Sequence, residues 1–285
     1  MARPALRALA LALLAVLVAL GAAACGGGGD DGGEDLAQGL TPAELLTRSA
    51  AAMGELKSFY IALDVTGQTA IGAGADLPQG LGGLLNGPID ISGEGPVDPP
   101  DAASIDASAR VSGIGLQVNL TRVGDEVFLG VLGQDFRLDL PPEQVALLDF
   151  GELYPTLVSW TTNPVEAGRE DVDGDPTVKV TGTLDPATAL AGLGPAIGAG
   201  TITPAQARRA VSEGTVEMWI GTQDLLPRRV HLVLKADGTG VLDGVGAVDI
   251  DLTANFSAFD EPVDIQAPSN PRELDPDQLG SLVGG

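Results

Sequence analysis

The first 25 residues constrain this chain most, because they decide the compartment in which the rest can fold. Arg3 and Arg7 precede an uncharged apolar run that begins at Leu11, and the run ends at Gly21–Cys25, which reads GAAAC. A basic start, a short apolar core and small residues at its end are typical of a secretory signal peptide. The core is shorter than the roughly 20 residues of a membrane-spanning helix. The sequence therefore predicts that residues 1–24 are a signal peptide.

Cys25 is the only cysteine in the 285 residues, and it directly follows three alanines. This arrangement resembles a lipobox, in which the cysteine thiol is alkylated with diacylglycerol and becomes the mature N-terminus. It departs from the usual pattern at Ala22, where a large aliphatic residue is common. The alternative is ordinary signal cleavage after Ala24, which would leave a free thiol. We expect lipidation of Cys25, and hence a protein anchored on the extracytoplasmic face of the cell membrane, because two acyl chains suffice for stable attachment.

The charge of the chain restricts its partners. It has 39 acidic against 15 basic residues, a net charge of −24, and 4% aromatic residues. Such a chain lacks the basic surface of a nucleic-acid-binding protein, and an anionic membrane surface would repel it. Attachment to a membrane is therefore expected to come from the acyl chains on Cys25 alone.

Composition divides the mature chain into three parts. Residues 25–40 are the lipidated cysteine and a flexible Gly/Asp-rich tether, with a reach of about 20 Å. Residues 41–270 form the folded domain, which opens with a capping box at Thr41–Glu44, and residues 271–285 are a loose tail. Residues 67–88 carry leucines among glycines, and we interpret them as a mobile flap over an apolar space. The alternative is a loop whose leucines pack into the core.

Alternation of apolar and polar residues dominates the domain. It recurs from residue 59 to 140 and is most regular from 215 to 256, while helical patches are expected over 42–55, 141–160 and 185–211. Strands with one apolar and one polar face predict an antiparallel sheet with one face covered and the other in water. The apolar members of these strands are the predicted inward residues: Ile61, Leu63, Val118, Leu120, Leu129, Met218, Ile220, Leu232 and Leu234.

Small residues on the inward face leave two interpretations open. The chain has 40 glycines, and alanines such as Ala107, Ala109 and Ala254 occupy inward strand positions. Small side chains on a covered face can leave unfilled volume that accepts an apolar ligand. They can equally let two layers approach closely in an ordinary packed core.

Residues that carry enzyme chemistry are scarce. His231 is the only histidine, and it falls on the polar face of its strand, so a histidine-activated nucleophile is not expected, although a lysine base stays open. Asp171–Asp175 resembles the opening of a calcium loop, but Pro176 and Gly182 replace its glycine and glutamate. The segment instead predicts an Asp-Gly hairpin turn. We therefore predict no enzyme activity, no metal site and no cofactor.

Several short segments, taken in order, resemble the LppX/LprAFG lipoprotein family. They are 49–60 (SAAAMxxxKSFY, with x unspecified), 172–174 (VDG) with 180–184 (VTGTL), 217–220 (EMWI), 226–230 (LPRRV), 248–252 (VDIDL) and 259–268 (FDEPVDIQAP). The resemblance implies a single LolA/LolB-like α+β domain. In such a domain a strongly curved antiparallel β-sheet, a half-barrel, is covered by helices and encloses an apolar cavity.

The resemblance also implies a function. Such a protein would bind acylated lipids or glycolipids in the cavity and carry them in the cell envelope, with no catalytic residues, and the nine inward residues would be the cavity candidates. One alternative is a regulatory or scaffold module that binds a protein partner through the same fold. A second is an envelope hydrolase. The sequence identifies neither the lipid nor an envelope transporter or other partner protein.

Replacing the anchor residue tests the predicted attachment. Cys25→Ser should release the protein from the membrane fraction into the soluble fraction, because the acidic body has no attraction of its own for an anionic bilayer. Membrane fractionation in high salt, followed by immunoblotting, measures this. If the Cys25→Ser protein stays with the membranes, the lipobox interpretation is wrong.

Overall fold

A computed structural model describes residues 34–71, 87–111, 114–140, 145–146, 148–193, 203–237, 239 and 245–273. The chain divides into two units, Met1–Asp35 and Leu36–Gly285, and all of the described secondary structure belongs to the second. The predicted signal peptide and Cys25 lie outside the described residues.

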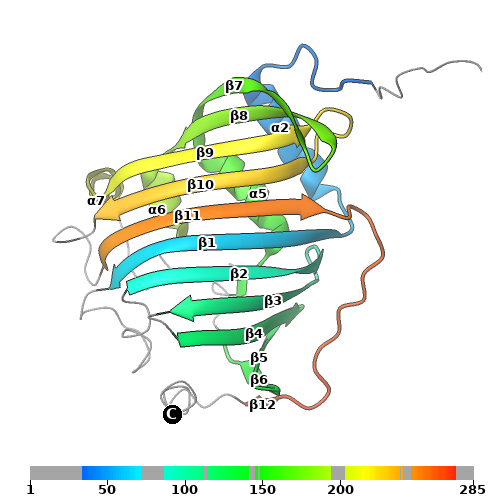
Figure 1. The fold of residues 1–285 in the computed structure, drawn as a ribbon, viewed down its shortest axis with the longest axis vertical. Coiled ribbons are helices and arrows are strands. Elements are labelled where there is room, and N and C mark those ends of the chain that lie inside the picture. The colour runs from blue at the N-terminus through cyan, green and yellow to red at the C-terminus, as the bar shows by residue number, and fades with distance from the viewer. Residues whose placement is uncertain are drawn as a thin grey trace, which may run out of the picture. The chain divides into compact units, whose positions relative to one another are not determined.

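A single 12-stranded sheet is the framework of the second unit (Figure 1). Its order is β12-β6-β5-β4-β3-β2-β1-β11-β10-β9-β8-β7. Neighbouring strands pair antiparallel, except that β12 pairs parallel with β6. The strands are β1 (Phe59–Ile71), β2 (Gly87–Asp98), β3 (Ala102–Val111), β4 (Ile114–Val123), β5 (Glu126–Val131), β6 (Gln134–Leu138), β7 (Thr161–Val172), β8 (Asp175–Leu184), β9 (Val211–Gly221), β10 (Pro227–Asp237), β11 (Val245–Ser257) and β12 (Arg272–Glu273).

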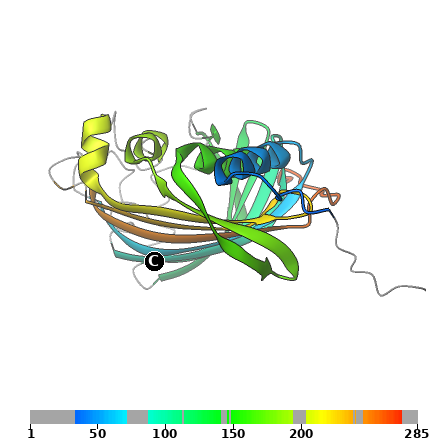
Figure 2. The same ribbon diagram turned by 90° about the horizontal axis from the view of Figure 1, so that it is seen from above.

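The helices lie on one face of the sheet, as Figure 2 shows. They are α2 (Pro42–Gly54), α5 (Phe150–Trp160), α6 (Pro186–Leu193) and α7 (Pro204–Ala210). The predicted capping box is confirmed at the start of α2, where the Thr41 side chain accepts from the Glu44 amide and Glu44 reaches back to the Thr41 amide. Within the described part of the chain, no helix is both long and apolar enough to cross a membrane.

The strands alternate as predicted, with an apolar face toward the helices and a polar face away from them. On β1, Phe59 and Ile61 are fully buried, whereas Asp64 and Thr66, which belong to the alternate series further along the strand, are exposed. The Phe256 ring of β11 lies 6.0 Å from that of Phe59 and 6.2 Å from that of Tyr154 in α5, measured between centroids. The core therefore lies between the middle of the sheet and helices α2 and α5.

The strong curvature expected of a half-barrel is not confirmed. The strands bend in a shallow arc beneath the helices (Figure 2), and the sheet stays open with β7 and β12 at separate edges. Strong curling needs β-bulges or glycine kinks within the strands. The register shifts here lie at strand ends, as at Thr69/Ile71, or on the edge strand β7. The pairings from β1–β2 to β5–β6 contain no register shift.

The boundaries of the folded unit differ from the expected ones in three places. Leu36 already donates its amide to the Thr222 carbonyl, and Ala37 is buried, so the second unit begins before Thr41. β1 and β2 extend into the predicted flap from both sides, and its remaining residues 72–86 lie outside the described residues. At the other end, Arg272 and Glu273 of the predicted loose tail pair with β6.

A buried hydroxyl pair joins the two helices of the core. Ser49 of α2 and Tyr154 of α5 are both fully buried, and their hydroxyl oxygens lie 2.8 Å apart. Burial raises the pKa of Tyr154, although the hydrogen bond with Ser49 opposes this effect, so the phenol stays neutral at ordinary pH. A buried polar group without a partner destabilises a fold, so the pair favours one position of α2 against α5.

Tyr154→Phe tests this hydrogen bond. It should lower the free energy of unfolding by about 1–2 kcal/mol, since it leaves the Ser49 hydroxyl buried without this partner. Denaturant unfolding measures the change. The double variant Ser49→Ala/Tyr154→Phe should lose less than the sum of the single changes. Ser159→Ala, at an exposed hydroxyl of the same helix, is the control and should change stability by less than about 0.5 kcal/mol. An unchanged stability in Tyr154→Phe would show that the hydrogen bond is not stabilising.

Candidate functional site

The nine predicted cavity residues lie on one face of the sheet but in two different environments. Four of them are no more than 3% exposed and belong to the packed core: Ile61, Met218, Ile220 and Leu234. Leu63 and Leu232 are half-buried and pack against that core. Val118, Leu120 and Leu129 are half-buried on β4 and β5, beyond the core cluster. The two environments divide the predicted set into core positions and accessible positions.

The accessible positions belong to a larger apolar surface, which we call the half-buried apolar face. Its members come from five neighbouring strands and are all half-buried: Leu63, Val65, Ile91, Ala107, Ala109, Leu116, Val118, Leu120 and Leu129. One row of directly paired residues crosses it, Leu63–Gly93–Ala107–Val118–Val131. A second row, Val65–Ile91–Ala109–Leu116, lies beside the first. Directly paired residues share a face, so these side chains form one continuous surface.

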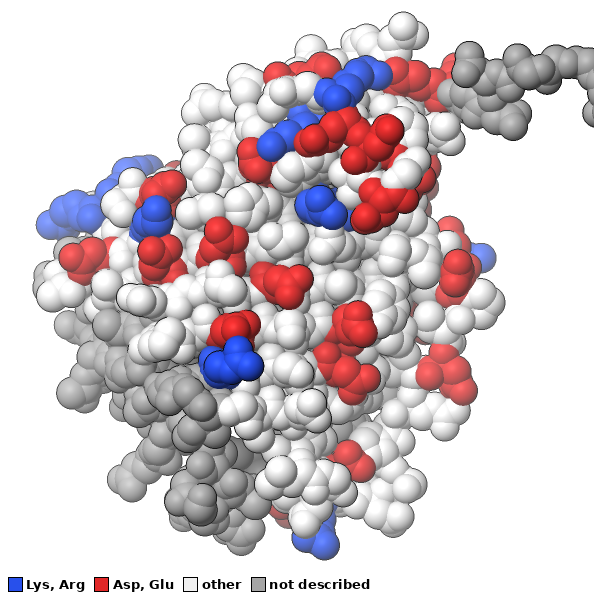
Figure 3. Space-filling model, in the orientation of Figure 1, with Lys and Arg blue, Asp and Glu red and all other residues white. Residues whose placement is uncertain are grey.

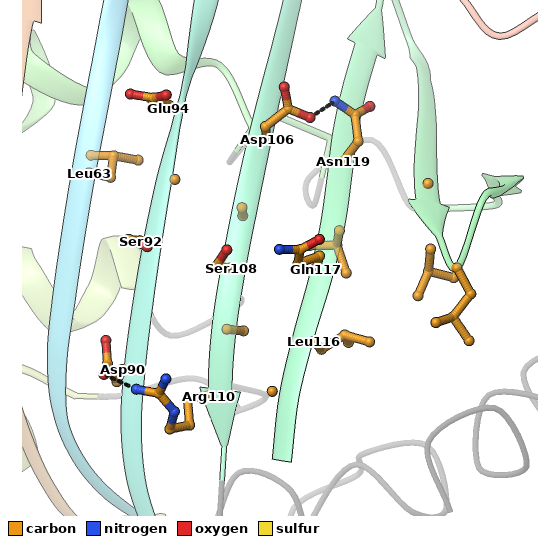
Figure 4. A pocket seen from close by; sticks show the side chains of 18 of the residues that line it. Leu63, Asp90, Ser92, Glu94, Asp106, Ser108, Arg110, Leu116, Gln117 and Asn119 are labelled. Carbon is orange, nitrogen blue, oxygen red and sulfur yellow. Dashed lines mark hydrogen bonds and ion pairs between the residues drawn. The ribbon is translucent and has the colours of Figure 1, made fainter. Parts of the chain in front are cut away.

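A hollow of about 1240 Å³ lies along the same strands, from β1 to β6. The residues that line it come from both alternating series of these strands. One series is small or apolar and includes Leu63, Ala107, Leu116 and Val118. The other is polar, and Figure 4 shows its side chains along β2, β3 and β4. Asp90 and Ser92 of β2 line the hollow, whereas Ile91 between them does not, so the hollow lies on the polar face of these strands. An apolar cavity stays a prediction.

The polar series is acidic and internally hydrogen-bonded. Arg110 pairs with Asp90 at 3.0 Å between Nη1 and Oδ2, and Asn119 donates to Asp106 at 2.9 Å (Figure 4). Tyr60 lies beside these residues, and burial, followed by the charges of Glu94 and Asp106, raises its pKa. Such a surface hydrogen-bonds well with water and is a poor contact for acyl chains. An apolar ligand is therefore expected on the opposite, half-buried apolar face.

His231 lies on the polar face, as the sequence predicted, among charged neighbours from adjacent strands. Its ring nitrogens lie 3.4 Å from a Glu217 oxygen and 3.0 Å from an Asp251 oxygen. Burial alone would raise the pKa of Glu217, but hydrogen bonds from Lys179 and His231 outweigh this effect and lower it. Figure 3 shows acidic side chains scattered over this face, with fewer basic ones between them. These contacts are cross-strand polar pairs, which stabilise a sheet modestly.

The segment that resembled a calcium loop is a hairpin turn, as predicted. Asp173 and Gly174 both have positive φ, at 54° and 96°, and connect β7 to β8. Asp175 pairs with Arg228, and an Asp173 oxygen lies 3.7 Å from Arg229. The carboxylates of this turn therefore neutralise arginines of β10. In the described ranges no group of three or more His, Cys, Asp or Glu side chains has the arrangement of a metal site.

The sequence prediction missed part of the apolar face. Val65, Ile91 and Leu116 were not among its candidates, although each follows the same alternation as a predicted neighbour. The register of the β1–β2, β2–β3 and β3–β4 pairs places them in one row, and that register depends on contacts between strands. Leu132, on the β5–β6 turn, was also missed, because nothing in a turn sequence indicates that its side chain borders a hollow.

Comparison with known proteins identifies the fold. No family model matches the sequence, and no curated protein matches it. Among solved structures, however, the chain matches those of LppX and LprF, which confirms the predicted resemblance at the level of the fold. The likeness is structural, since the sequence identities are 20% or lower in these matches.

Three of the matching structures are the following. The lipoprotein LppX of Mycobacterium tuberculosis matches with a TM-score of 0.50 and 20% identity, covering 79% of this chain and 98% of LppX. LprF of Mycobacterium bovis matches with a TM-score of 0.50 and 17% identity, covering 80% of this chain and 97% of LprF. A LolA superfamily protein from Nitrosomonas europaea has a TM-score of 0.25 and 9% identity, over 80% of this chain and 96% of that protein. This chain thus spans nearly the whole length of LppX and LprF.

Proposed function

We propose that the mature protein is a lipid-anchored lipoprotein on the extracytoplasmic face of the cell membrane. Its domain binds acylated lipids or glycolipids and carries them in the cell envelope, without catalysing a reaction. The observation that supports this most is the half-buried apolar face of β1–β5. The shared fold with the lipoprotein LppX supports the proposal independently.

The half-buried apolar face suits an acyl chain both in its apolar composition and in the shape of its surface. Its central positions, Gly93, Ala107 and Ala109, have minimal side chains, while Leu63 and Leu116 border them. A Cβ added at Gly93 would lie 3.2 Å from Ile105 Cγ2 and 3.3 Å from Ala107 Cβ, so the row is close-packed sideways. The space that small residues leave is therefore above the sheet surface. A flexible hydrocarbon chain fits a smooth apolar surface of this kind.

Energetics explain why carrying a lipid needs no chemical step. Burial of a CH₂ group is worth about 0.8 kcal/mol, and an acyl chain in a bilayer already has this stabilisation. A carrier has to offer the chain a comparable apolar surface, so that transfer is nearly neutral in free energy and reversible. The half-buried apolar face offers such a surface, while the packed core around Ile61 and Met218 does not, because those side chains are already buried.

Val118→Trp tests the proposal at the centre of the apolar face. The indole should fill the space above the sheet and reduce bound lipid, as native mass spectrometry of the purified protein would show. Stability should change by less than about 1 kcal/mol, because overpacking costs of about 1–3 kcal/mol arise where no free volume exists. Gln117→Trp is the matched control, since it places the same side chain one residue away on the opposite face, and it should leave lipid occupancy unchanged.

Two results would contradict the proposal. A wild-type protein that carries no lipid, together with strong destabilisation of Val118→Trp, would show that this face is part of an ordinary packed core. A loss of ligand in Gln117→Trp but not in Val118→Trp would place the ligand on the polar face and argue for a polar compound.

A further inference from the structure

The hollow of about 1240 Å³ lies on the polar face of β1–β6, away from the helices, and the proposed lipid binding makes no use of it. Arg110 is the one base among the described residues that line it. The carboxylates that line it are five, and all are exposed: Asp64, Asp90, Glu94, Asp106 and Asp135. The lining therefore carries a formal excess of four negative charges.

Two of these carboxylates face each other directly across neighbouring strands. Glu94 of β2 pairs with Asp106 of β3. The next residues in the same row are Ala62 on β1 and Asn119 on β4, so neither carboxylate has a base directly opposite. Burial, followed by the charges of Glu94 and Asp106, raises the pKa of the nearby Tyr60 phenol. Like charges directly opposite each other destabilise an antiparallel pair of strands.

The polar face of β9–β11 has the opposite arrangement. There Lys235 lies directly opposite Glu213 on one side and Asp249 on the other, and His231 lies directly opposite Glu217. The Lys235 ammonium is 2.8 Å from a Glu213 oxygen. Opposite charges in such positions stabilise a sheet. One face of the sheet thus has balanced charges on β9–β11 and unbalanced charges around the hollow.

Hydrogen bonds relieve only part of the repulsion in the hollow. Asn119 donates to Asp106 at 2.9 Å, while Arg110 pairs with Asp90, in another row, at 3.0 Å (Figure 4). A glutamine at Glu94 would remove the repulsion and keep the alternation of the strand, so folding alone does not explain the charge. Local choices that disfavour the fold are expected at functional sites.

The size of the hollow indicates a long ligand. Its volume of about 1240 Å³ exceeds the range of about 300–1,000 Å³ that is typical of small-molecule pockets. Its lining residues come from six neighbouring strands, β1 to β6. At about 4.8 Å between strands, the hollow spans about 24 Å. An extended peptide of about seven residues has this length, at about 3.3 Å per residue.

Neutral polar side chains lie among the carboxylates. Ser92, Ser108 and Gln117 are directly paired in one row and line the hollow. Hydroxyl and amide groups can hydrogen-bond with the N–H and C=O groups of an extended backbone, and carboxylates bind ammonium and guanidinium groups strongly. None of the described residues that line the hollow is aromatic, which argues against a ligand bound by stacking.

We propose that the hollow is a docking site for an extended, lysine- or arginine-rich segment of a partner protein. The basic side chains of the segment would pair with the carboxylates of the hollow, and a cation beside Glu94 and Asp106 would relieve their repulsion. This inference goes beyond lipid binding, because it uses the other face of the sheet. The protein would then hold a lipid on one face and a partner on the other.

A fluorescein-labelled octalysine peptide, added to the purified mature protein, tests the docking site. Fluorescence anisotropy at low salt gives the Kd. Glu94→Gln/Asp106→Asn should weaken binding about tenfold, because two charge pairs with the peptide are lost. The same variant should unfold at a higher temperature than the wild type, because a repulsion is removed. A purely structural role of the two carboxylates would not combine weaker binding with higher stability.

Glu213→Gln/Asp249→Asn is the matched control. It removes two carboxylates from the same polar face and gives the same net charge, but both positions lie outside the hollow. It should bind the peptide with the wild-type Kd and unfold at a lower temperature, since Lys235 loses both partners. Non-specific attraction of the peptide to a chain of net charge −24 would weaken equally in both double variants.

Carbodiimide crosslinking locates the bound peptide, since the reagent joins lysine amines to carboxylates that they contact. Peptide mass spectrometry then maps the crosslinks. We expect them at Glu94, Asp106 and Asp135, the carboxylates of the hollow on β2, β3 and β6.

Three results would overturn the docking site. Equal losses of affinity in the two double variants would show non-specific attraction. Crosslinks confined to the carboxylates of β9–β11 would place the peptide outside the hollow. Spermine that binds in the hollow as tightly as octalysine would identify a small polyamine, and not a protein segment, as the occupant. Lipid occupancy is measured separately, so failure of the docking site leaves the proposed function standing.

Discussion

The rest of the structure depends on the alternation of apolar and polar residues along the strands. It depends equally on the continuous register with which β1 to β5 pair. Pairing across the sheet places Leu63, Gly93, Ala107, Val118 and Val131 in one row. A slip of one residue in any of these strands would turn its apolar side chains to the polar face. The antiparallel ladder therefore separates an apolar surface, which packs against helices or remains accessible, from an acidic surface that meets water.

The helices cover only part of the apolar face of the sheet. Around Ile61, Met218 and Phe256 the sheet forms a closed core with α2 and α5, stabilised further by the buried Ser49–Tyr154 hydrogen bond. The side chains of the half-buried apolar face, on β1 to β5, remain partly accessible. One sheet thus combines a rigid packed region with an accessible apolar region, and the first holds the second in place. This division accounts for a fold that can offer an apolar surface to a ligand and remain stable.

Local patterns in the sequence predicted local features well. The Thr41–Glu44 capping box, the Asp173-Gly174 turn and the position of His231 on the polar face each depend on a few neighbouring residues. Features that depend on distant contacts were not predictable. The shallow curvature depends on how the strands pair across the whole sheet, and the parallel pairing of Arg272 with Phe136 joins residues far apart in the chain. Of the nine cavity candidates, alternation gave the correct face, but only packing against α2 and α5 decides which side chains remain accessible.

Photo-crosslinking tests most directly whether the half-buried apolar face holds acyl chains. A lipid with a diazirine near the end of its acyl chain is loaded into the purified protein, irradiated, and the adducts are mapped by peptide mass spectrometry. Adducts at apolar positions of β1–β5, such as Ala107, Leu116 and Val118, are the expected result. Adducts confined to the polar series around Ser108 and Gln117, or to β7–β10, would contradict the assignment of this face as the lipid-binding surface.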